Sequence, residues 1–228
     1  MDKRMLKREF SSFGIQIDDD QADKFILFYD ELVEWNKKFN LTRIVDDMDV
    51  IQKHFLDSLI ARDIIGQNCA DIGSGSGFPA IPLLILDNKI KYLMIDSSNK
   101  RVKFLNHIIQ LLNLNATAIH ARAEDLGKDS KYRERFDSVT SRAVAPLNII
   151  AEHSSGLVKV GGSIIMYKGP GALDEIKDNK LFYKLSLGDP QIKSYSYEWG
   201  ERKLIINKKI NKLNVKLPRA RAIIEKSL

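Results

Sequence analysis

Three glycines, each separated from the next by one residue, follow an aspartate between two apolar runs of the chain. The stretch reads CADIGSGSGFPAIPLL over residues 69–84, so Asp71 precedes Gly73, Gly75 and Gly77. Because glycine has no Cβ, such a loop can turn tightly and its backbone can approach a ligand closely. Where an apolar strand leads into a turn of this kind, the expected ligand contains an adenosine.

The spacing of the glycines separates three classes of adenosine ligand. A nucleotide phosphate loop requires Lys followed by Ser or Thr after its last glycine, and this chain has neither there. A dinucleotide loop requires G-x-G-x-x-G, but Phe78 stands where its third glycine would be. The pattern D-x-G-x-G-x-G instead favours S-adenosylmethionine, which has an adenosine and a charged amino-acid tail but no phosphate.

Acidic residues at the ends of two later strand-like runs favour the same ligand. Asp96 ends KYLMID, where a carboxylate can accept hydrogen bonds from both ribose hydroxyls. Glu124 and Asp125 follow in HARAEDL, beside the expected adenine. Each acid alone is more often a helix cap or a solvated turn. Their succession at three strand ends favours a methyl-donor site over a nucleotide-binding oxidoreductase or a fold without a ligand.

The elements that would position these residues alternate between strand-like and helix-like patterns after residue 66. The strand-like runs are NCADIG, KYLMIDS, ATAIHARA, FDSVTSRA and GSIIMYKG, and the clearest helix is NKRVKFLNHIIQLLNL. Two further runs, IKSYSYEW and RKLIINKK, flank Gly200 and Glu201 and predict an antiparallel hairpin. We therefore expect an α/β fold of the Rossmann-like class I methyltransferase type, with a doubly wound, mostly parallel seven-stranded sheet.

A different pattern precedes residue 66. Residues 18–39 place apolar side chains at spacings of three and four behind an acidic start, which predicts an amphipathic helix. A second helix is expected over about 47–65. We accordingly predict an N-terminal helical subdomain over 1–66 and a methyltransferase domain over 67–228 that ends in a basic tail.

The composition indicates what class of protein this is and what kind of partner it binds. The chain of 228 residues has 44% hydrophobic residues and a formal charge of +6, as expected for a soluble globular protein with a polyanionic partner. The single cysteine, Cys69, excludes an internal disulfide and a cysteine cluster for a metal. With no apolar run near the roughly 20 residues of a membrane span, a cytoplasmic, metal-free protein is expected. From Arg202 onward, nine Lys or Arg stand against one acid, which predicts a phosphate-facing edge.

Missing motifs restrict the methyl acceptor. Enzymes that methylate exocyclic amino groups carry [DNS]PP[YFW] after the fourth strand, where this chain has SRAVAP. Methylation of pyrimidine carbon 5 needs a thiolate, but Cys69 lies at the start of a strand that we expect to be buried. The remaining acceptors have their own lone pair, such as guanine nitrogen 7, and need alignment rather than a general base.

Several motifs occur together in an order and spacing that resemble one family. EWNKKFNLT, HFLDSL, DIGSGSGFPAIPL, DSSNKRVKFL, ARAEDL, FDSVTSRAVAPL and YKG, within about residues 32–170, resemble the glucose-inhibited division protein B family, the ribosomal RNA small-subunit methyltransferase G. The resemblance implies methyl transfer from S-adenosylmethionine to a guanine nitrogen 7 in the decoding region of bacterial 16S rRNA. It also implies that the partner is this RNA or the small ribosomal subunit; we expect the protein to act as a monomer.

The family's donor-binding positions correspond to Gly73, Phe78, Ala123, Glu124 and Arg142 of this chain. With the glycine-loop and strand-end residues, the predicted donor-binding set is Asp71, Gly73, Gly75, Gly77, Phe78, Asp96, Ser97, Ala123, Glu124 and Arg142. The chain departs from the family pattern in two places. Ala80 replaces a glycine, and the C-terminal motif retains only Pro218 and Arg219.

No catalytic residue is assigned, but Arg142, Lys168 and His54 are candidates. His54 and Asp57 lie three residues apart and could form a polar pair on one helix face. Candidates for RNA contacts are Lys100, Arg101, Lys208, Lys209 and Arg219. The rival hypotheses are a donor-binding but non-catalytic RNA-binding or ribosome-assembly factor, and a methyltransferase for a small molecule.

Overall fold

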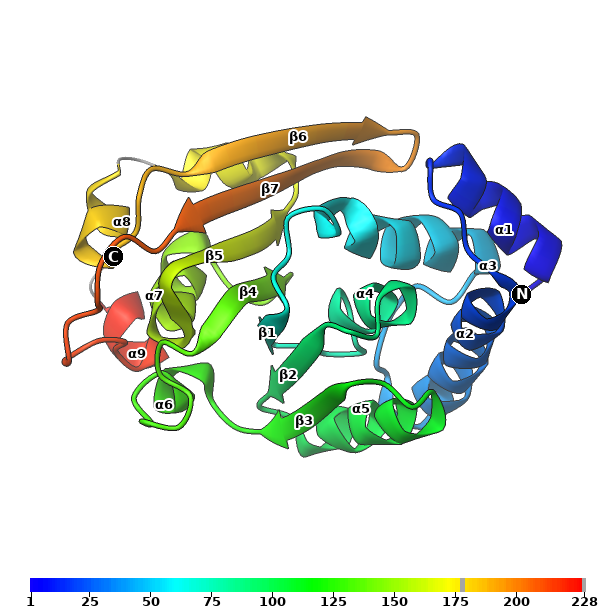
Figure 1. Ribbon diagram of the computed structural model, residues 1–228, viewed down its shortest axis with the longest axis horizontal. Helices are drawn as coiled ribbons and strands as arrows, with labels where there is room; N and C mark the ends of the chain where they lie inside the picture. Colours follow the sequence, from blue (N-terminus) through cyan, green and yellow to red (C-terminus); the bar gives the residue numbers. More distant parts are fainter. Residues whose placement is uncertain (177–178, 227–228) are drawn as a thin grey trace.

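A seven-stranded sheet forms the centre of the computed structural model, which describes residues 1–176 and 179–226 (Figure 1). The strand order is β3-β2-β1-β4-β5-β7-β6; β1 to β5 are parallel, and β7 is antiparallel to both β5 and β6. The strands are β1 (Asn68–Ile72), β2 (Lys91–Asp96), β3 (Ala116–His120), β4 (Phe136–Arg142), β5 (Val158–Lys168), β6 (Gln191–Tyr197) and β7 (Gly200–Lys208). The predicted sheet and hairpin are confirmed. Gly200, however, pairs with Tyr197 and begins β7, so the turn comes earlier than expected.

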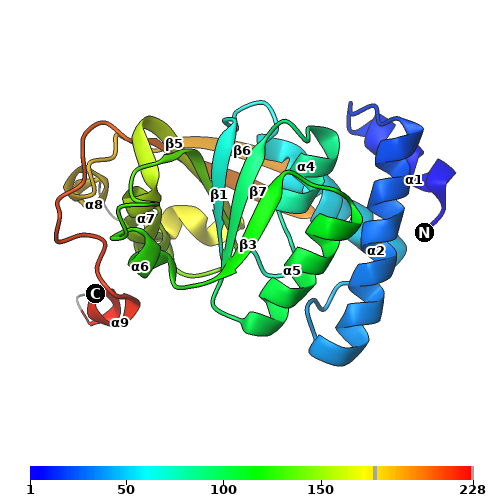
Figure 2. The ribbon, with the colours of Figure 1, turned by 60° about the horizontal axis from the view of Figure 1, so that its bottom comes forward.

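Helices cover both faces of the sheet, with α4, α5 and the N-terminal helices on one face and α6 and α7 on the other (Figure 2). Their bounds are α1 (Lys3–Ser12), α2 (Asp19–Phe39), α3 (Asp47–Val50), η1 (Ile51–Leu56), η2 (Leu59–Ala61), α4 (Ala80–Leu86), α5 (Asn99–Leu111), α6 (Ala123–Leu126), α7 (Leu147–Leu157), η3 (Pro170–Glu175), α8 (Lys180–Lys184) and α9 (Arg221–Glu225). The predicted helix over 18–39 is α2. It begins at a reciprocal cap in which the Asp18 carboxylate accepts from the Gln21 N–H and the Gln21 amide oxygen accepts from the Asp18 N–H.

The predicted helix over 47–65 is helical only as far as Ala61, and its geometry changes along its length. It is an α-helix over α3, a π-helix over η1 and a 3-10 helix over η2. A π turn is wider than an α turn and is frequent at functional sites. Here the π turn contains Lys53 and His54, whose polar atoms meet a side chain from the sheet.

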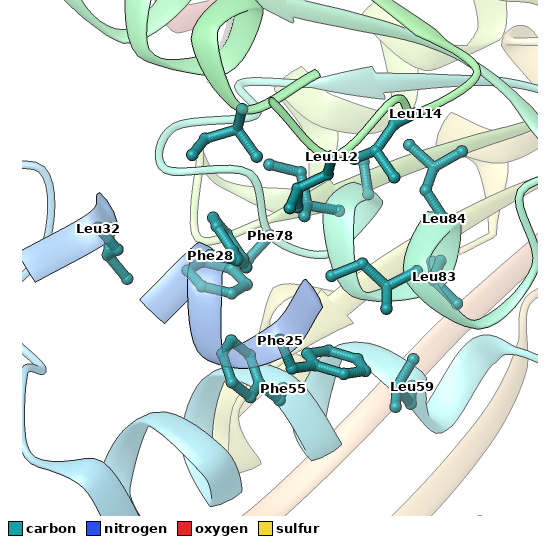
Figure 3. Packing of buried hydrophobic residues seen from close by; sticks show 14 of the residues in the cluster. Phe25, Phe28, Leu32, Phe55, Leu59, Phe78, Leu83, Leu84, Leu112 and Leu114 are labelled. Carbon is teal, nitrogen blue, oxygen red and sulfur yellow. The ribbon is translucent and has the colours of Figure 1, made fainter. Parts of the chain in front are cut away.

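Aromatic rings join the N-terminal helices to the sheet domain. Phe25 and Phe28 of α2 pack with Phe55 of η1, and the Phe28 and Phe78 ring centroids are 5.3 Å apart (Figure 3). These side chains belong to one continuous core that also includes Leu83 of α4. Burial of these rings is the main force that holds the N-terminal helices to the sheet domain.

The predicted division of the chain falls at residue 66, two residues before β1 begins at Asn68. Helices on both sides of this boundary share one core. The division into 1–66 and 67–228 therefore stays a prediction, and residues 177–178 and 227–228 of the second part lie outside the described residues.

Over the described ranges, no helix is long and apolar enough to cross a membrane. Within the same ranges, no three His, Cys, Asp or Glu side chains gather in a way that could hold a metal ion.

Candidate functional site

A cavity of about 80 Å³ opens at the carboxyl ends of β1, β2 and β3. This is the sheet edge where the strand order reverses between β1 and β4, which is the usual ligand position in a doubly wound sheet. Five predicted donor-binding residues line the cavity: Gly73, Asp96, Ser97, Ala123 and Glu124. Asp71, Gly75, Gly77, Phe78 and Arg142 do not line it.

The glycine loop is held by the end of β2. The N–H groups of Gly73 and Ser74 donate to the Ile95 carbonyl, and the Gly75 N–H donates to Asp96 Oδ2 at 2.9 Å. Gly73 has a φ of +67°, and a Cβ on it would lie 2.6 Å from Val144 Cγ2. Only glycine therefore fits between this backbone and the loop after β4.

Asp96 holds this loop and also faces the cavity. Its Oδ1 accepts from the Ser98 N–H at 2.8 Å, and Arg101 Nη1 lies 3.6 Å from its Oδ2. Each carboxylate oxygen can accept more than one hydrogen bond. Asp96 therefore retains acceptor capacity for hydroxyl groups of a ligand.

Asp71 lies beneath the loop and is fully buried. Its Oδ1 accepts from the Thr140 hydroxyl at 2.7 Å, and its Oδ2 has no partner among the described residues. Burial raises the pKa of Asp71 to about 7, a shift that the hydrogen bond from Thr140 partly opposes, while the Ser74 hydroxyl donates to the Asp71 backbone carbonyl at 3.1 Å. Cys69 is also buried, as predicted, and burial raises the pKa of its thiol to about 12.

A second polar cluster joins the end of β4 to η1. Arg142 Nη1 donates to Asp57 Oδ2 at 2.8 Å and to the Lys53 carbonyl, while its Nη2 donates to His54 Nδ1 at 2.8 Å. The guanidinium carbon also lies 5.2 Å from the centroid of the Phe78 ring. Burial lowers the pKa of Arg142, and the Asp57 carboxylate counteracts that shift.

His54 is neutral in this cluster. Because Nδ1 accepts from Arg142, the ring proton is on Nε2, which donates to the Thr42 hydroxyl at 2.9 Å. Burial, and then the charge of Arg142, lowers the pKa of His54 to about 3. Both ring nitrogens are occupied, so His54 has no lone pair available for a general base. His54 and Asp57 each contact Arg142, whereas the sequence predicted a pair between them.

Lys168 is held at the end of β5 by neighbouring groups. Its Nζ donates to the Ala145 carbonyl at 3.2 Å and to Glu175 Oε2 at 3.0 Å. Glu175 Oε2 in turn accepts from the Leu147 N–H. These contacts hold the chain just after Val144, at Ala145 and Leu147, so Lys168 helps to position the loop that follows β4.

The predicted RNA-contacting residues fall into two groups. Lys100, Arg101 and Lys208 are exposed, with Lys100 Nζ 5.9 Å from the Phe39 ring centroid. Lys209 is only 1% exposed, and its ammonium donates to the Ser155 carbonyl and lies 3.3 Å from Glu134 Oε1. The prediction that Lys209 contacts RNA was therefore wrong, because no phosphate can reach that ammonium.

Arg219 also differs from its prediction. Its guanidinium donates to the carboxylate of Glu152, with Nε–Oε1 and Nη2–Oε2 distances of 2.9 and 2.7 Å. That geometry occupies the face of the guanidinium that would bind a phosphate. In this structure Arg219 holds the chain to α7 and is not a free RNA contact.

Ten of the residues that line the cavity were not predicted, among them Val144, His153 and Arg221. His153 could have been found, because it shares one face of α7 with Ile149 and Ile150 at helical spacing, and all three line the cavity. Nothing local marks Arg221, whose N–H donates at 3.5 Å to Glu124 Oε1 across 97 residues of sequence.

Comparison with known sequences gives one consistent family. The family model described as rRNA small subunit methyltransferase G matches residues 21–205. A protein of Carboxydothermus hydrogenoformans, described as ribosomal RNA small subunit methyltransferase G, is 40% identical over 97% of each chain. A protein of Clostridium kluyveri with the same description is 40% identical over 94% of this chain and 93% of its own.

Comparison with solved structures shows the fold. The cofactor-bound structure of Rv0187 from MTB superposes with a TM-score of 0.57 at 17% identity, covering 87% of this chain and all of that one. M. jannaschii TYW2 in complex with AdoMet gives a TM-score of 0.53 at 17% identity over 75% of this chain and 80% of that chain. The predicted Rossmann-like methyltransferase fold is confirmed.

Proposed function

Because the chain belongs to the family of rRNA small subunit methyltransferase G, we propose that it methylates nitrogen 7 of a guanine in the decoding region of 16S rRNA. The methyl donor in this proposal is S-adenosylmethionine. The observation that carries the proposal is the family match over residues 21–205, which includes every residue that lines the cavity except Arg221. We also propose that the protein acts as a monomer in the cytoplasm.

The residues around the cavity fit this donor. Asp96 retains acceptor capacity suited to ribose hydroxyls, and Glu124 offers a carboxylate to the exocyclic amino group of an adenine. Gly73 leaves the backbone beside the cavity uncovered by a side chain of its own. When bound, S-adenosylmethionine supplies an electrophilic methyl group on a sulfonium.

The chemistry that the site lacks also supports a guanine nitrogen 7 as the acceptor. This nitrogen has its own lone pair and carries no proton, so its methylation needs no general base. His54 is neutral with both nitrogens occupied, and the thiol of Cys69 is buried and protonated at neutral pH. The protein's contribution is then to align the acceptor with the methyl group and exclude water.

We propose that the exposed cations Lys100, Arg101 and Lys208 contact phosphates of the RNA. Lys100 and Arg101 lie in the first turn of α5, beside the edge where β2 ends. Their charge does not favour the positive end of the helix dipole, which supports a role in binding an anion.

The donor site can be tested by Gly73→Ala. The added Cβ would meet Val144 at 2.6 Å and would force a positive φ on a non-glycine residue. We expect the affinity for S-adenosylhomocysteine, measured by calorimetry, to fall about tenfold or more. Gly14→Ala is the matched control, because Gly14 has a φ of +74° but no neighbour within 4 Å of an added Cβ.

The acceptor can be tested in cells that lack the gene. 7-Methylguanosine in 16S rRNA is mapped by chemical cleavage at the modified base, with and without a plasmid that encodes the parent, Gly14→Ala or Gly73→Ala. The parent and Gly14→Ala should restore one modified guanine, and Gly73→Ala should not. An identical map in cells with and without the gene would refute the proposed acceptor and favour one of the rival functions.

A further inference from the structure

The C-terminal segment, defined here as residues 213–225, lies against the sheet domain beside α6 and α7 (Figure 1). The Arg133 guanidinium donates to the carbonyls of Leu213, Asn214 and Leu217 at 3.0, 3.1 and 2.7 Å. The Leu213 N–H donates to Glu134 Oε1 at 2.8 Å. The start of the segment is therefore fixed by several backbone hydrogen bonds to residues that precede β4.

Pro218 fits into a notch between two glycines. A Cβ on Gly127 would lie 2.8 Å from Pro218 Cγ, and a Cβ on Gly156 would lie 2.8 Å from Pro218 Cδ. The glycines thus allow the proline ring to contact the backbone after α6 and the backbone of α7. Pro218 is buried in this position.

Arg219, the next residue, pairs with Glu152 of α7, whose side chain is 0% exposed. Glu152 accepts from the Arg219 backbone N–H at 2.7 Å and from its Nε and Nη2. The hydrogen bond with Glu152 raises the pKa of Arg219. A buried carboxylate with charge-assisted bonds of this kind is a strong and directional anchor.

This anchor brings Arg221 to the cavity. Arg221 lines the cavity, and its N–H donates to Glu124 Oε1 at 3.5 Å. On the other side of the same carboxylate, His153 Nδ1 lies 3.5 Å from Glu124 Oε2. His153 Nε2 is buried and has no partner among the described residues. The Glu124 end of the cavity is therefore built from α6, α7 and the C-terminal segment together.

We propose that the C-terminal segment completes the donor cavity, and that Glu152 and Arg219 are positioning residues that hold Arg221 beside Glu124. This inference rests on the proposed function, since the ligand in question is the methyl donor. It assigns Arg219 to donor binding rather than to RNA binding. Glu124 recognises the adenosine part of the donor only while its carboxylate is held from both sides.

Arg219→Gln tests the anchor. The substitution leaves Glu152 without its cationic partner and releases the segment, so we expect the affinity for S-adenosylhomocysteine to fall about tenfold in calorimetry. The double variant Glu152→Gln with Arg219→Gln replaces the ion pair by two neutral amides that can hydrogen-bond to each other. We expect it to recover most of the affinity, a recovery that loss of charge alone would not produce.

Arg221→Ala tests the contribution of the Arg221 side chain to the cavity and leaves the Glu152–Arg219 ion pair in place. The Arg221 side chain is 45% exposed and pairs with Glu225 of α9, so the variant loses that surface pair and the side chain at the cavity but keeps the backbone N–H that donates to Glu124. We expect about a threefold loss of affinity for S-adenosylhomocysteine. Lys216→Ala is the matched control, because it removes an exposed positive charge from the same segment; its affinity should equal that of the parent.

The binding of a 16S rRNA fragment is measured in parallel over a range of salt concentrations. Parent-like RNA binding with weakened binding of S-adenosylhomocysteine supports the proposal. The inference is overturned if Arg219→Gln and Arg221→Ala bind S-adenosylhomocysteine as the parent does, or if they lose RNA affinity alone. Should Arg219→Gln fail to fold, the result for Arg221→Ala decides. A parent that does not bind S-adenosylhomocysteine would instead refute the proposed function.

Discussion

Two arginine–carboxylate pairs, each with a buried carboxylate, join the two ends of the chain to the sheet domain. The arginine belongs to the sheet domain in one pair and to the end of the chain in the other. In the N-terminal pair, the sheet supplies Arg142 and the helical segment before β1 supplies Asp57. In the C-terminal pair, α7 supplies the carboxylate of Glu152 and the terminal segment supplies Arg219. The same chemistry thus serves two separate attachments.

The two pairs differ in which partner depends on the other. Side-chain exposure is 14% for Arg142 and 6% for Asp57, so both partners are desolvated. Arg219 is 36% exposed, while Glu152 is 0% exposed. Burial lowers the pKa of Arg142, but the bond to Glu152 raises the pKa of Arg219. In the first pair each ion needs its partner, whereas in the second only the carboxylate does.

The largest effect is expected for Asp57→Asn. Asp57 compensates two cations, because Arg202 Nε lies 2.6 Å from its Oδ1. Removing the carboxylate leaves the buried Arg142 uncompensated, so the free energy of unfolding should fall by about 3–5 kcal/mol in urea denaturation. Asp63→Asn is the control, since the Asp63 side chain is 79% exposed and its loss should change stability by less than about 0.5 kcal/mol. Similar losses for both variants would show that the N-terminal pair is not interdependent.

In the C-terminal pair, replacing the arginine should lower the free energy of unfolding more than replacing the carboxylate. Arg219→Gln leaves the Glu152 carboxylate buried without its cation and should cost about 2–3 kcal/mol of unfolding free energy. Glu152→Gln leaves Arg219 near the surface, where water can solvate the guanidinium, and should cost about 1 kcal/mol. Urea denaturation of both variants under one condition measures the difference. Equal losses of unfolding free energy for Arg219→Gln and Glu152→Gln would show that both ions of the C-terminal pair depend on each other, as in the N-terminal pair.

The parts of the fold that the sequence predicted are those fixed by local pattern. Apolar runs marked the strands, and a glycine loop with Asp96 at the end of the next strand marked the sheet edge that holds the cavity. The prediction failed where the helix geometry departs from the 3.6-residue period of an α-helix. His54 and Asp57 were expected on one face of an α-helix, but the π turn between them changes that spacing, and both reach Arg142 instead.

The C-terminal contacts could not be predicted, because they join residues far apart in sequence. Arg219 and Glu152 are 67 residues apart, and no pattern in either segment signals the other. A count of positive charges also does not separate buried from exposed cations. Lys208 is exposed and Lys209 is buried because successive side chains at the end of a strand point to opposite faces. The basic tail therefore contains cations of two kinds: Lys209 and Arg219 are held in ion pairs with the sheet domain, whereas Lys208, Lys212 and Lys216 are exposed.

A histidine lies beside each of the two ion pairs, and lowering the pH should reduce the free energy of unfolding through His54 more than through His153. His54 has its pKa lowered to about 3, so between an ordinary value near 6.5 and about 3 the unfolded chain binds a proton that the folded one does not. Stability from His54 is therefore complete above about pH 6.5 and is lost as the pH falls, by up to about 1.4 kcal/mol per pH unit. In His54→Gln this part of the slope should disappear when urea denaturation is repeated from pH 7 to pH 4.

His153→Gln is the matched comparison at the C-terminal attachment. Burial also lowers the pKa of His153, but the neighbouring Glu124 favours its protonated form, whereas the neighbour of His54 is the cation Arg142. Replacing His153 should therefore reduce the acid slope less than replacing His54. If the two replacements changed the slope equally, burial alone would govern both histidines. A larger change for His54 would show that the sign of the neighbouring charge makes the N-terminal attachment the more acid-sensitive of the two.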